Sequence, residues 1–581
     1  MYPFTRLKYG KGDLDKARTG MEALSKGKQN RGMIKVIYNG RVYQKRGSFC
    51  EALIIDKGRI AGTGSSRELL EAVPPGAEKI DAQGALVMPA FYDSHVHLMW
   101  LGRRAGGIEG AGAESIEEII RRGRDFMVRL KPPPHSFIQG AGINPDLFSS
   151  GEKRDLCRED LDKISVECPI ILSRHCGHTI YCNSLALKLA GISERGPELE
   201  GGTIEKDENG RPTGILRENA NALVRKLIPA PSREEMKRLL SLAMNKAHSL
   251  GISACGSYDA GGPDFESIVE VFRDIYDESR ETGIPALRVT MQCGISSDEN
   301  YLDYYLNRIK TSGRLLWEDP RWGTFLKMGP LKLFADGTLG GQTAWMKQPY
   351  WDKPETRGFP VLDENTLNRF VQKAAAGTMQ TVIHAIGDAG MDAVISAYEK
   401  ITAPGENHLR HGIIHCQISS TKLLERMARN KILALVQPIF LADDIHILES
   451  RVGPELASTS YAWGTMEKLG IPVSYSTDAP VASLDPLPGL EWAVLRRSSD
   501  GITSPGCLNP RERVDLYSAV DAYTAGSAFA CFDENSLGRI APGYMADLIF
   551  IDRDIFTTPP DEIRRARLLQ TMCAGEIVYR A

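Results

Sequence analysis

The fold is decided by the stretch Ala85-Leu86-Val87-Met88-Pro89-Ala90-Phe91-Tyr92-Asp93-Ser94-His95-Val96-His97. Its apolar half predicts a buried strand, and residues two apart in a strand point to the same side. At the carboxyl end of a barrel strand, the imidazoles of His95 and His97 would both face the barrel mouth. Imidazole is a good ligand for zinc and related metals. Because a histidine pair on a strand is a weak signal by itself, a metal site here requires further ligands from elsewhere in the chain.

Seven more apolar strand patterns follow the first one. The expected strands are 84–92, 251–257, 287–294, 328–335, 380–385, 411–416, 432–439 and 471–476. Amphipathic stretches such as 233–250 and 365–376 alternate with them, so the pattern predicts an α/β fold of the TIM type, a (β/α)8 barrel. About 160 residues separate the first two strands, which is too long for one crossover helix. We therefore expect an insertion after the first strand, over about 103–230, that lies across one barrel mouth.

Both ends of the chain read as short strands separated by turn pairs such as Asn39-Gly40 and Lys57-Gly58. We expect the two ends to pair into one small β-sandwich, formed by residues 33–88 and 537–581, with the barrel at 89–536. Residues 1–32 are rich in Lys, Arg and Gly and are expected to form a flexible basic arm. The alternative is that the natural chain starts at Met33.

The composition excludes several classes of protein. The chain of 581 residues carries 71 basic and 74 acidic side chains, a net charge of −3, so no charge excess indicates nucleic acid or an anionic membrane as partner. It has no apolar run of about 18 residues and no apolar segment of a secretory signal at its start. Its 11 cysteines form no CxxC pair, which favours a reducing compartment. We expect a cytoplasmic protein.

Candidate metal ligands recur at the ends of later strands. His384 and His415 close two of them, Asp478 follows the last, and Lys332 lies inside an apolar strand where an unpaired ammonium is costly to bury. Counted with the histidine pair, these residues lie on strands one, four, five, six and eight. Each has a structural explanation of its own: a core histidine, a turn aspartate, or an ion pair between Lys332 and Asp336. Their combination on five ordered strands predicts a metal centre.

This order of HxH, Lys, His, His and Asp resembles the binuclear-metal pattern of the amidohydrolase superfamily, over about 33–581. More closely, the chain looks like the amidohydrolase family 3 branch, which includes N-substituted formamide deformylases. The runs that carry this closer likeness are His178 with 183–187, 210–214, 216–220, 332–337, 476–481 and 538–548. One departure is Thr477, where the family usually shows a Ser-Asp-Ala-Pro run. It leaves Asp478 in place.

The resemblance implies that two divalent metal ions share six ligands, which are His95, His97, Lys332, His384, His415 and Asp478. The first two histidines and Asp478 would bind the more buried ion, and the other two histidines would bind the more exposed one. Lys332 would be N6-carboxylated and bridge the ions, which also removes the cost of burying an ammonium. An unmodified Lys332 would leave a mononuclear site. Zn²⁺ is the expected metal, with Mn²⁺ and Fe²⁺ as alternatives.

The resemblance also implies hydrolysis of a C–N bond outside peptides, in an amide or an N-substituted formamide. A metal-activated hydroxide would attack the carbonyl, and Asp478 would act as general base and then as general acid toward the leaving amine. A deaminase of a cyclic amidine or an aminated heterocycle is the alternative, because it uses the same ligands and differs in releasing ammonia. The alternative of another class is a non-catalytic binding or regulatory relative. Such a relative would lack a ligand, whereas all six positions are filled here.

Residues for substrate contact are less sharply indicated. By resemblance, His178 would donate a hydrogen bond to the substrate carbonyl; a second zinc site around it lacks a fourth ligand and a recognised spacing. Arg217 and Glu218 form either a surface pair or a pocket wall. Trp345 and Gln437 lie at or just past strand ends and are candidates to line the pocket. The resemblance also implies a small-molecule substrate and allows a homodimer, although the sequence shows no interface.

Overall fold

The computed structural model describes residues 34–145, 148–149, 154–174, 179–194, 202–295, 299–312, 316–497 and 506–581. The predicted basic arm and His178 lie outside these residues. The chain divides into two compact units, one formed by Met1–Leu98 with Met244–Ala581 and the other by Met99–Ala243. None of the described helices combines the length and the apolar character that crossing a bilayer requires.

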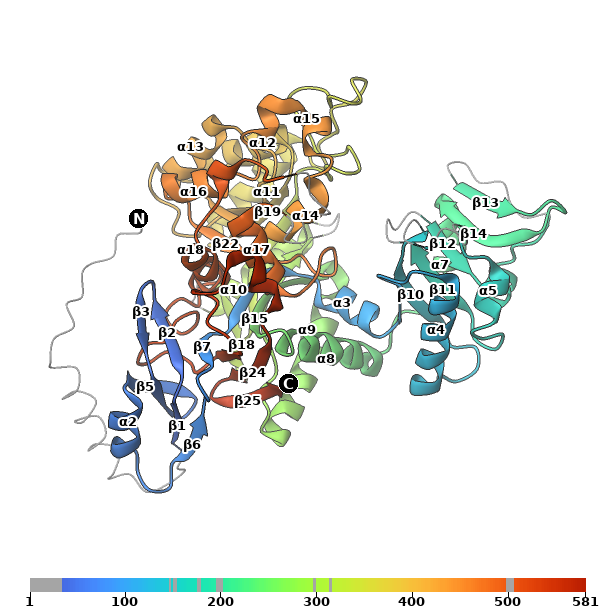
Figure 1. The fold of residues 1–581 in the computed structure, drawn as a ribbon. Helices are drawn as coiled ribbons and strands as arrows, with labels where there is room; N and C mark the ends of the chain where they lie inside the picture. Colours follow the sequence, from blue (N-terminus) through green and yellow to red (C-terminus); the bar gives the residue numbers. More distant parts are fainter. Residues whose placement is uncertain are drawn as a thin grey trace. The chain divides into compact units, whose positions relative to one another are not determined.

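The first unit contains a nearly closed barrel of parallel strands (Figure 1). In order around the sheet these are β8 (Phe91–Val96), β15 (Ile252–Gly261), β16 (Arg288–Gly294), β18 (Gly323–Phe334), β19 (Thr381–Ala385), β20 (Gly412–His415), β21 (Leu433–Val436) and β22 (Val473–Tyr475). Side-chain and loop hydrogen bonds link the last strand to the first, with Ser94 Oγ 3.0 Å from Ser474 Oγ. The chain therefore has a mixed α/β fold built around a barrel of eight parallel strands, as its strand pattern predicts.

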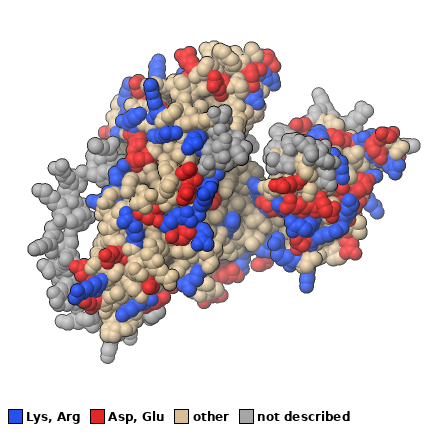
Figure 2. All heavy atoms as spheres, in the orientation of Figure 1, with Lys and Arg blue, Asp and Glu red and all other residues tan. Residues whose placement is uncertain are grey.

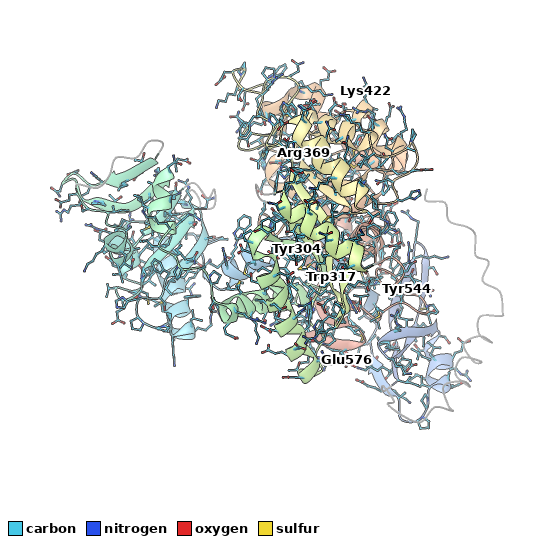
Figure 3. The ribbon with its side chains drawn as sticks, turned by 180° about the vertical axis from the view of Figure 1, so that it is seen from behind. Tyr304, Trp317, Arg369, Lys422, Tyr544 and Glu576 are labelled. Carbon is cyan, nitrogen blue, oxygen red and sulfur yellow. The ribbon has the colours of Figure 1, made fainter. Side chains whose placement is uncertain are left out.

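Helices on the outside of the barrel follow most of its strands and return the chain to the same edge. They are α9 (Phe265–Thr282), α10 (Asn300–Ser312), α11 (Glu364–Ala376), α12 (Asp388–Glu399), α13 (Thr421–Arg429), α16 (Trp463–Leu469) and α17 (Pro486–Leu495). Local sequence sets their ends: the side chain of Asp363 caps α11 by accepting the N–H of Thr366. Seen from behind, Tyr304 lies on α10 and Arg369 on α11 (Figure 3).

The stretch at 84–92 is not the single barrel strand that its hydrophobicity predicts. Leu86–Pro89 forms β7 in a separate sheet, and the barrel strand β8 begins at Phe91. Every residue of both strands is buried, so the apolar pattern continues across the break and cannot mark it. As a result, His95 lies inside β8 and His97 one residue beyond its end.

Strands from both ends of the chain form two further sheets in the first unit. The strands are β1 (Lys35–Tyr38), β2 (Arg41–Lys45), β3 (Ser48–Cys50), β4 (Ala52–Asp56), β5 (Arg59–Gly64), β6 (Glu78–Asp81), β7, β23 (Leu548–Ile551), β24 (Leu568–Cys573) and β25 (Glu576–Arg580). One sheet has the order β5-β4-β1-β6 and the other β25-β24-β23-β7-β2-β3, with β23 antiparallel to β7. Side chains from both ends share one apolar core, among them Leu53, Val87 and Phe550. The exact domain bounds given above stay predictions.

The second unit has its own sheet, ordered β13-β14-β12-β11-β10-β9. Its strands are β9 (Ile108–Glu109), β10 (Ile138–Ile143), β11 (Ile170–Arg174), β12 (Thr179–Cys182), β13 (Gly202–Lys206) and β14 (Pro212–Glu218), and α4 (Ile116–Leu130) packs on it through Ile119 and Ile120. On the face that Figure 2 shows, acidic and basic side chains are intermixed in each unit. This mixing agrees with the small net charge of −3.

A buried ion pair joins the barrel to the sheet that contains β23. It leads to a prediction about stability. Arg288 Nε, at the start of β16, lies 3.0 Å from a carboxylate oxygen of Asp547, and both side chains are buried. Arg288→Ala leaves that carboxylate buried without its cation, so we expect the free energy of unfolding to fall by about 3–5 kcal/mol. Urea unfolding followed by circular dichroism measures it.

The control for this prediction is Arg567→Ala, which breaks an exposed ion pair with Asp552. Solvent screens that pair, so its loss is expected to cost about 1 kcal/mol or less. Equal losses in the two variants would contradict the role given to Arg288.

Candidate metal centre

The structure gathers the predicted ligands at the carboxyl ends of the barrel strands. They are His95 in β8, His97 just after it, Lys332 in β18, His384 in β19, His415 at the end of β20 and Asp478 after β22. Because these strands run parallel, side chains that are far apart in sequence meet at one edge. His95, His97 and Asp478 are called the inner cluster below, and His384 and His415 the outer pair.

The inner cluster has the geometry of a metal site. Asp478 Oδ1 lies 3.3 Å from His95 Nε2 and 3.1 Å from His97 Nε2. One ligand atom from each of these three residues lies within 4.8 Å of the others. His95 and Asp478 are buried and His97 is half-buried, so His97 is the member of the cluster that is partly open to solvent.

Hydrogen bonds set the tautomers of the two inner histidines. His95 Nδ1 donates to Gln292 Oε1 at 2.8 Å, and the Gln292 amide nitrogen donates to the Ser94 carbonyl, which fixes the amide orientation. His97 Nδ1 donates to the carbonyl of Tyr258 at 3.0 Å. In the neutral form, each ring therefore directs an Nε2 lone pair at Asp478.

This arrangement fits a bound cation. Burial lowers the pKa of His95 well below its ordinary range, so the ring is neutral at pH 7. Asp478 Oδ1 is buried and has no hydrogen-bond donor in the described part of the chain. Its lone pairs thus face the lone pair of His95 Nε2 at 3.3 Å, a repulsive contact unless a cation lies between them. The donor set of two imidazoles and a carboxylate is typical of zinc.

The outer pair is oriented in the same way through different nitrogens. His384 Nε2 donates to the carbonyl of Gly337 at 2.9 Å, which leaves Nδ1 as its ligand atom. His415 Nδ1 donates to Gln437 Oε1 at 2.8 Å, which leaves Nε2. The two rings have centroids 4.4 Å apart, and burial lowers the pKa of His384 to about 3. Burial also lowers the pKa of His415 well below its ordinary range, so both rings are neutral at pH 7 and offer a nitrogen lone pair to an ion.

Gln437 follows the end of β21 directly, and its side chain is engaged by other protein groups. It is buried, with 2 % of its surface exposed, and its amide nitrogen donates to Ser476 Oγ and to the Leu435 carbonyl. With its oxygen on His415, the side chain has no group left for a substrate. The strand-end position makes Gln437 a candidate to line the pocket, whereas its amide oxygen bonds to the candidate ligand His415.

The side-chain amine of Lys332 is the group of the centre whose burial is least compensated by hydrogen bonds. Its side chain is buried, and its Nζ has no hydrogen-bond partner in the described structure. The predicted alternative, an ion pair with Asp336, is absent there, and Nζ instead lies 4.5 Å from the centre of the Phe334 ring. Burial lowers the pKa of the amine to about 7 although Asp478 acts to raise it. A large share of this amine is therefore neutral near pH 7.

Two of the ligands adopt a backbone conformation that is uncommon for residues other than glycine. The φ angle is 82° at His415 and 56° at Asp478. Such conformations cost about 1–3 kcal/mol and persist where the surrounding structure enforces them. The chain thus holds both ligands in strained positions at the strand ends, which is typical of a functional site.

Asp93 also belongs to the centre, although sequence reasoning missed it. Its carboxylate is buried and accepts hydrogen bonds from the His95 N–H and from both the N–H and the hydroxyl of Thr477. It therefore ties the end of β8 to the segment that carries Asp478. The Thr477 hydroxyl makes a bond to Asp93 for which a serine hydroxyl would also be suited. The only sequence signal was the position of Asp93 two residues before His95.

Aromatic rings border the centre. Tyr258 lies 5.7 Å from the His97 ring, Phe334 lies 5.3 Å from the His384 ring, and Phe440 is stacked on His415 at 5.7 Å, all between ring centroids. All three rings are half-buried. Tyr258 lies inside β15, Phe334 is the last residue of β18, and Phe440 follows β21, so their positions near the carboxyl ends of strands are the signal that could have identified them.

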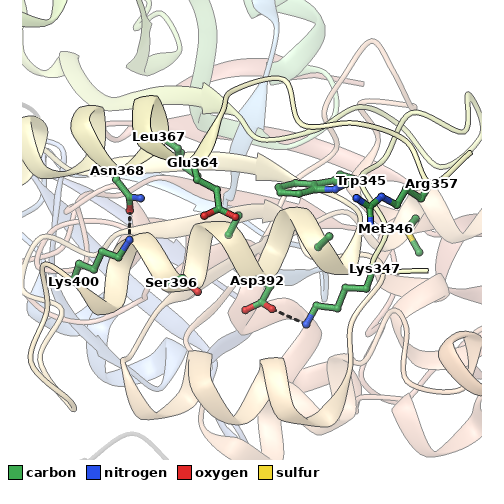
Figure 4. A pocket seen from close by; sticks show the side chains of 12 residues that line it. Trp345, Met346, Lys347, Arg357, Glu364, Leu367, Asn368, Asp392, Ser396 and Lys400 are labelled. Atoms are coloured by element: carbon green, nitrogen blue, oxygen red, sulfur yellow. Dashed lines mark hydrogen bonds and ion pairs between the residues drawn. The ribbon is translucent and has the colours of Figure 1, made fainter. Parts of the chain in front are cut away.

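The remaining predicted contacts lie outside this cluster. Trp345 lines a pocket of about 310 Å³ between α11 and α12, together with Glu364 and the ion pair of Lys347 and Asp392 (Figure 4). Arg217 belongs to the second unit, where it pairs with Glu205 at 2.6 Å and Asp155 at 2.8 Å. Glu218 ends β14 in the same unit.

Comparison with known proteins identifies the family of this chain. A family model described as "Amidohydrolase family" matches residues 78–579. The chain is 33 % identical over 550 residues to the putative amidohydrolase YtcJ of Bacillus subtilis, covering 94 % of this chain and 99 % of that protein. It is 26 % identical over 564 residues to the N-substituted formamide deformylase of Arthrobacter pascens, covering 95 % and 99 %.

A solved structure shows the same architecture. It is the crystal structure of a metal-dependent hydrolase from Pyrococcus furiosus, titled uncharacterized, with a TM-score of 0.70 and 27 % sequence identity. The likeness covers 90 % of this chain and 100 % of that one. The family match spans all eight barrel strands and every ligand described above. The chain therefore belongs to the amidohydrolase family of metal-dependent hydrolases, in its family 3 branch.

Proposed function

We propose that this protein hydrolyses a non-peptide C–N bond, in an amide or an N-substituted formamide, with Asp478 as general acid and base. One observation carries the proposal: Asp478 Oδ1 lies between the Nε2 atoms of two histidines that are oriented by their own hydrogen bonds. The likeness to a formamide deformylase favours the amide or formamide substrate over the deaminase alternative.

We also propose that the inner cluster and the outer pair hold two divalent ions, with Zn²⁺ as the expected metal and an N6-carboxylated Lys332 as the bridge. The neutral amine expected from its lowered pKa is the form that can be carboxylated, and a carbamate would replace the buried cation with an anionic ligand. A bound divalent ion supplies charge that polarises a carbonyl and lowers the pKa of a bound water to about 7.

The chain itself handles the proton. Asp478 is held by its own N–H, which donates to the His95 carbonyl at 2.9 Å, and by the bonds of Thr477 to Asp93. With its backbone fixed, the carboxylate accepts a proton from the attacking water and delivers it to the leaving nitrogen. An amine leaving group needs that proton, so one carboxylate that serves both steps suits this reaction. His178 stays a proposed donor to the substrate carbonyl.

The identity of the products tests the proposed reaction. The chelated protein is reloaded with Zn²⁺ and offered N-substituted formamides, N-acyl amines and aminated heterocycles. We expect formate or another carboxylate to appear with the matching amine, only after reloading. Release of ammonia would establish the deaminase alternative. No product from any class, with metal bound, would favour the non-catalytic alternative.

The orientation of His95 gives a separate prediction for the inner ion. Gln292→Leu removes the acceptor for His95 Nδ1, and losing such a partner weakens metal binding by about 10–100-fold. Competition with a chelator measures the affinity. The control is Gln380→Leu, which removes a buried amide that donates to the carbonyls of Arg410 and Ala530. If both variants bind metal like the unaltered protein, Gln292 has no part in the site.

A further inference from the structure

A buried carboxylate next to the metal centre collects backbone N–H groups from three positions. Asp336 lies two residues past β18, and 2 % of its surface is exposed. Its Oδ2 accepts the N–H groups of Gly387 at 2.7 Å and Trp345 at 3.0 Å, and its Oδ1 accepts the N–H of Ile386 at 3.0 Å. A Cβ atom at Gly390 would come within 2.7 Å of Oδ2, so the carboxylate is also enclosed from the side of α12.

These bonds converge on His384, a member of the outer pair. Asp336 Oδ1 lies 3.5 Å from His384 Nε2, whose nearer acceptor is the carbonyl of the next residue, Gly337, at 2.9 Å. Ile386, one of the three donors, follows His384 by two residues. Residues 336–337 therefore accept hydrogen bonds from the His384 ring and from the backbone N–H of Ile386, just after it.

We propose that Asp336 is a positioning residue for the metal ion that the outer pair would bind. Its carboxylate fixes the imidazole of His384 so that Nδ1 faces that ion. This inference rests on the proposed metal-dependent function. Ligand histidines commonly donate their second ring N–H to a carboxylate or carbonyl, and loss of that partner costs about 10–100-fold in metal affinity. The partners of the inner histidines are Gln292 and the Tyr258 carbonyl, so the role of Asp336 is specific to the outer site.

An amide cannot replace this carboxylate. The three backbone N–H groups and the ring N–H of His384 all approach oxygen atoms that only accept. In Asp336→Asn, one oxygen becomes an NH₂ group, which only donates. In either amide orientation, the NH₂ group opposes at least one of these donors, and the end of β19 must shift. A glutamate is excluded by the tight space beside Gly390.

The test measures metal affinity and activity separately. Asp336→Asn is reconstituted with Zn²⁺ and dialysed against graded chelator concentrations, and its metal content is measured by mass spectrometry. We expect one ion with the affinity of the unaltered protein and a second ion weakened by about 10–100-fold. Turnover should return as the Zn²⁺ concentration is raised, because the inner cluster, which includes Asp478, is unaltered.

The matched control is Asp388→Asn. Asp388 is buried at the start of α12 and accepts the N–H of Lys347, from the loop that also contains Trp345. No hydrogen bond or ion pair joins Asp388 to His384 within the described residues. This variant should therefore keep both ions at the original affinity, even if its unfolding midpoint falls.

Two results would overturn the proposal. The first is an Asp336→Asn protein that binds both ions as tightly as the unaltered protein, whatever its stability. The second is that the unaltered protein binds only one ion. That result would not reject the proposed hydrolysis, which is tested separately by the identity of its products. If Asp336→Asn does not fold, Gly390→Ala replaces it, because the added Cβ displaces the same carboxylate. Retention of both ions at full affinity by that variant would also reject the role.

Discussion

Asp478→Asn is expected to lower the turnover of the metal-loaded protein by about 10²–10⁴-fold. The asparagine amide can still offer an oxygen to a metal, so at least part of the metal should remain bound. It cannot accept a proton from water or return one to a leaving amine at neutral pH. The loss should therefore appear in kcat of protein whose metal content has been measured beforehand.

The control for this experiment is Asp485→Asn, seven residues further along. Asp485 caps α17 by accepting the N–H of Leu487, and asparagine is an equally good cap. This variant should retain its stability and turnover. Near-normal turnover of metal-loaded Asp478→Asn would remove Asp478 from the mechanism.

Replacing Lys332 is expected to have the second large effect. Lys332→Ala removes the proposed bridge between the ions, so metal content should fall and turnover should drop by more than about 100-fold. This exceeds the loss of about 10–100-fold expected when only a hydrogen-bond partner of a ligand is removed. Short carboxylic acids such as acetate or propionate should partly restore both, because they can place a carboxylate in the space left by the side chain.

Lys332→Met separates the lost ligand from lost volume. It keeps the length of the side chain but has no amine, and the buried amine has no hydrogen bond to lose. We therefore expect the metal-free variant to be at least as stable as the unaltered metal-free protein, while it loses metal as Lys332→Ala does. Binding of two ions at the original affinity by either variant would exclude the bridge.

The sequence predicts the barrel strands and where the candidate ligands lie along them, because both depend on local patterns. Each barrel strand is an apolar run, and the ligands lie at the ends of such runs, which all parallel strands present at one edge. The apolar pattern gave a wrong result at 84–92, where it predicts one strand. The structure has β7 and β8 there, two fully buried strands that belong to different sheets. Hydrophobicity alone has no feature that marks a change of sheet.

The partners of the ligands could not be predicted in this way. Asp93 and Thr477 are separated by 384 residues, and Gln292 and His95 by 197, so their bonds exist only because the closed barrel brings distant strands together. Gln437 shows the same limit, since the sequence places it near the centre but does not tell which way its amide turns. Which polar groups hold the ligands was therefore decided by the three-dimensional structure.

The most direct test of the central claim is a metal titration of the chelated protein. Zn²⁺ is added in known equivalents while carboxylate release from an amide substrate is followed, with bound metal measured at each step. We expect negligible turnover without metal, and a rise that reaches its plateau at two equivalents. Full turnover of the chelated protein, or a rate that does not change with bound metal, would contradict the account.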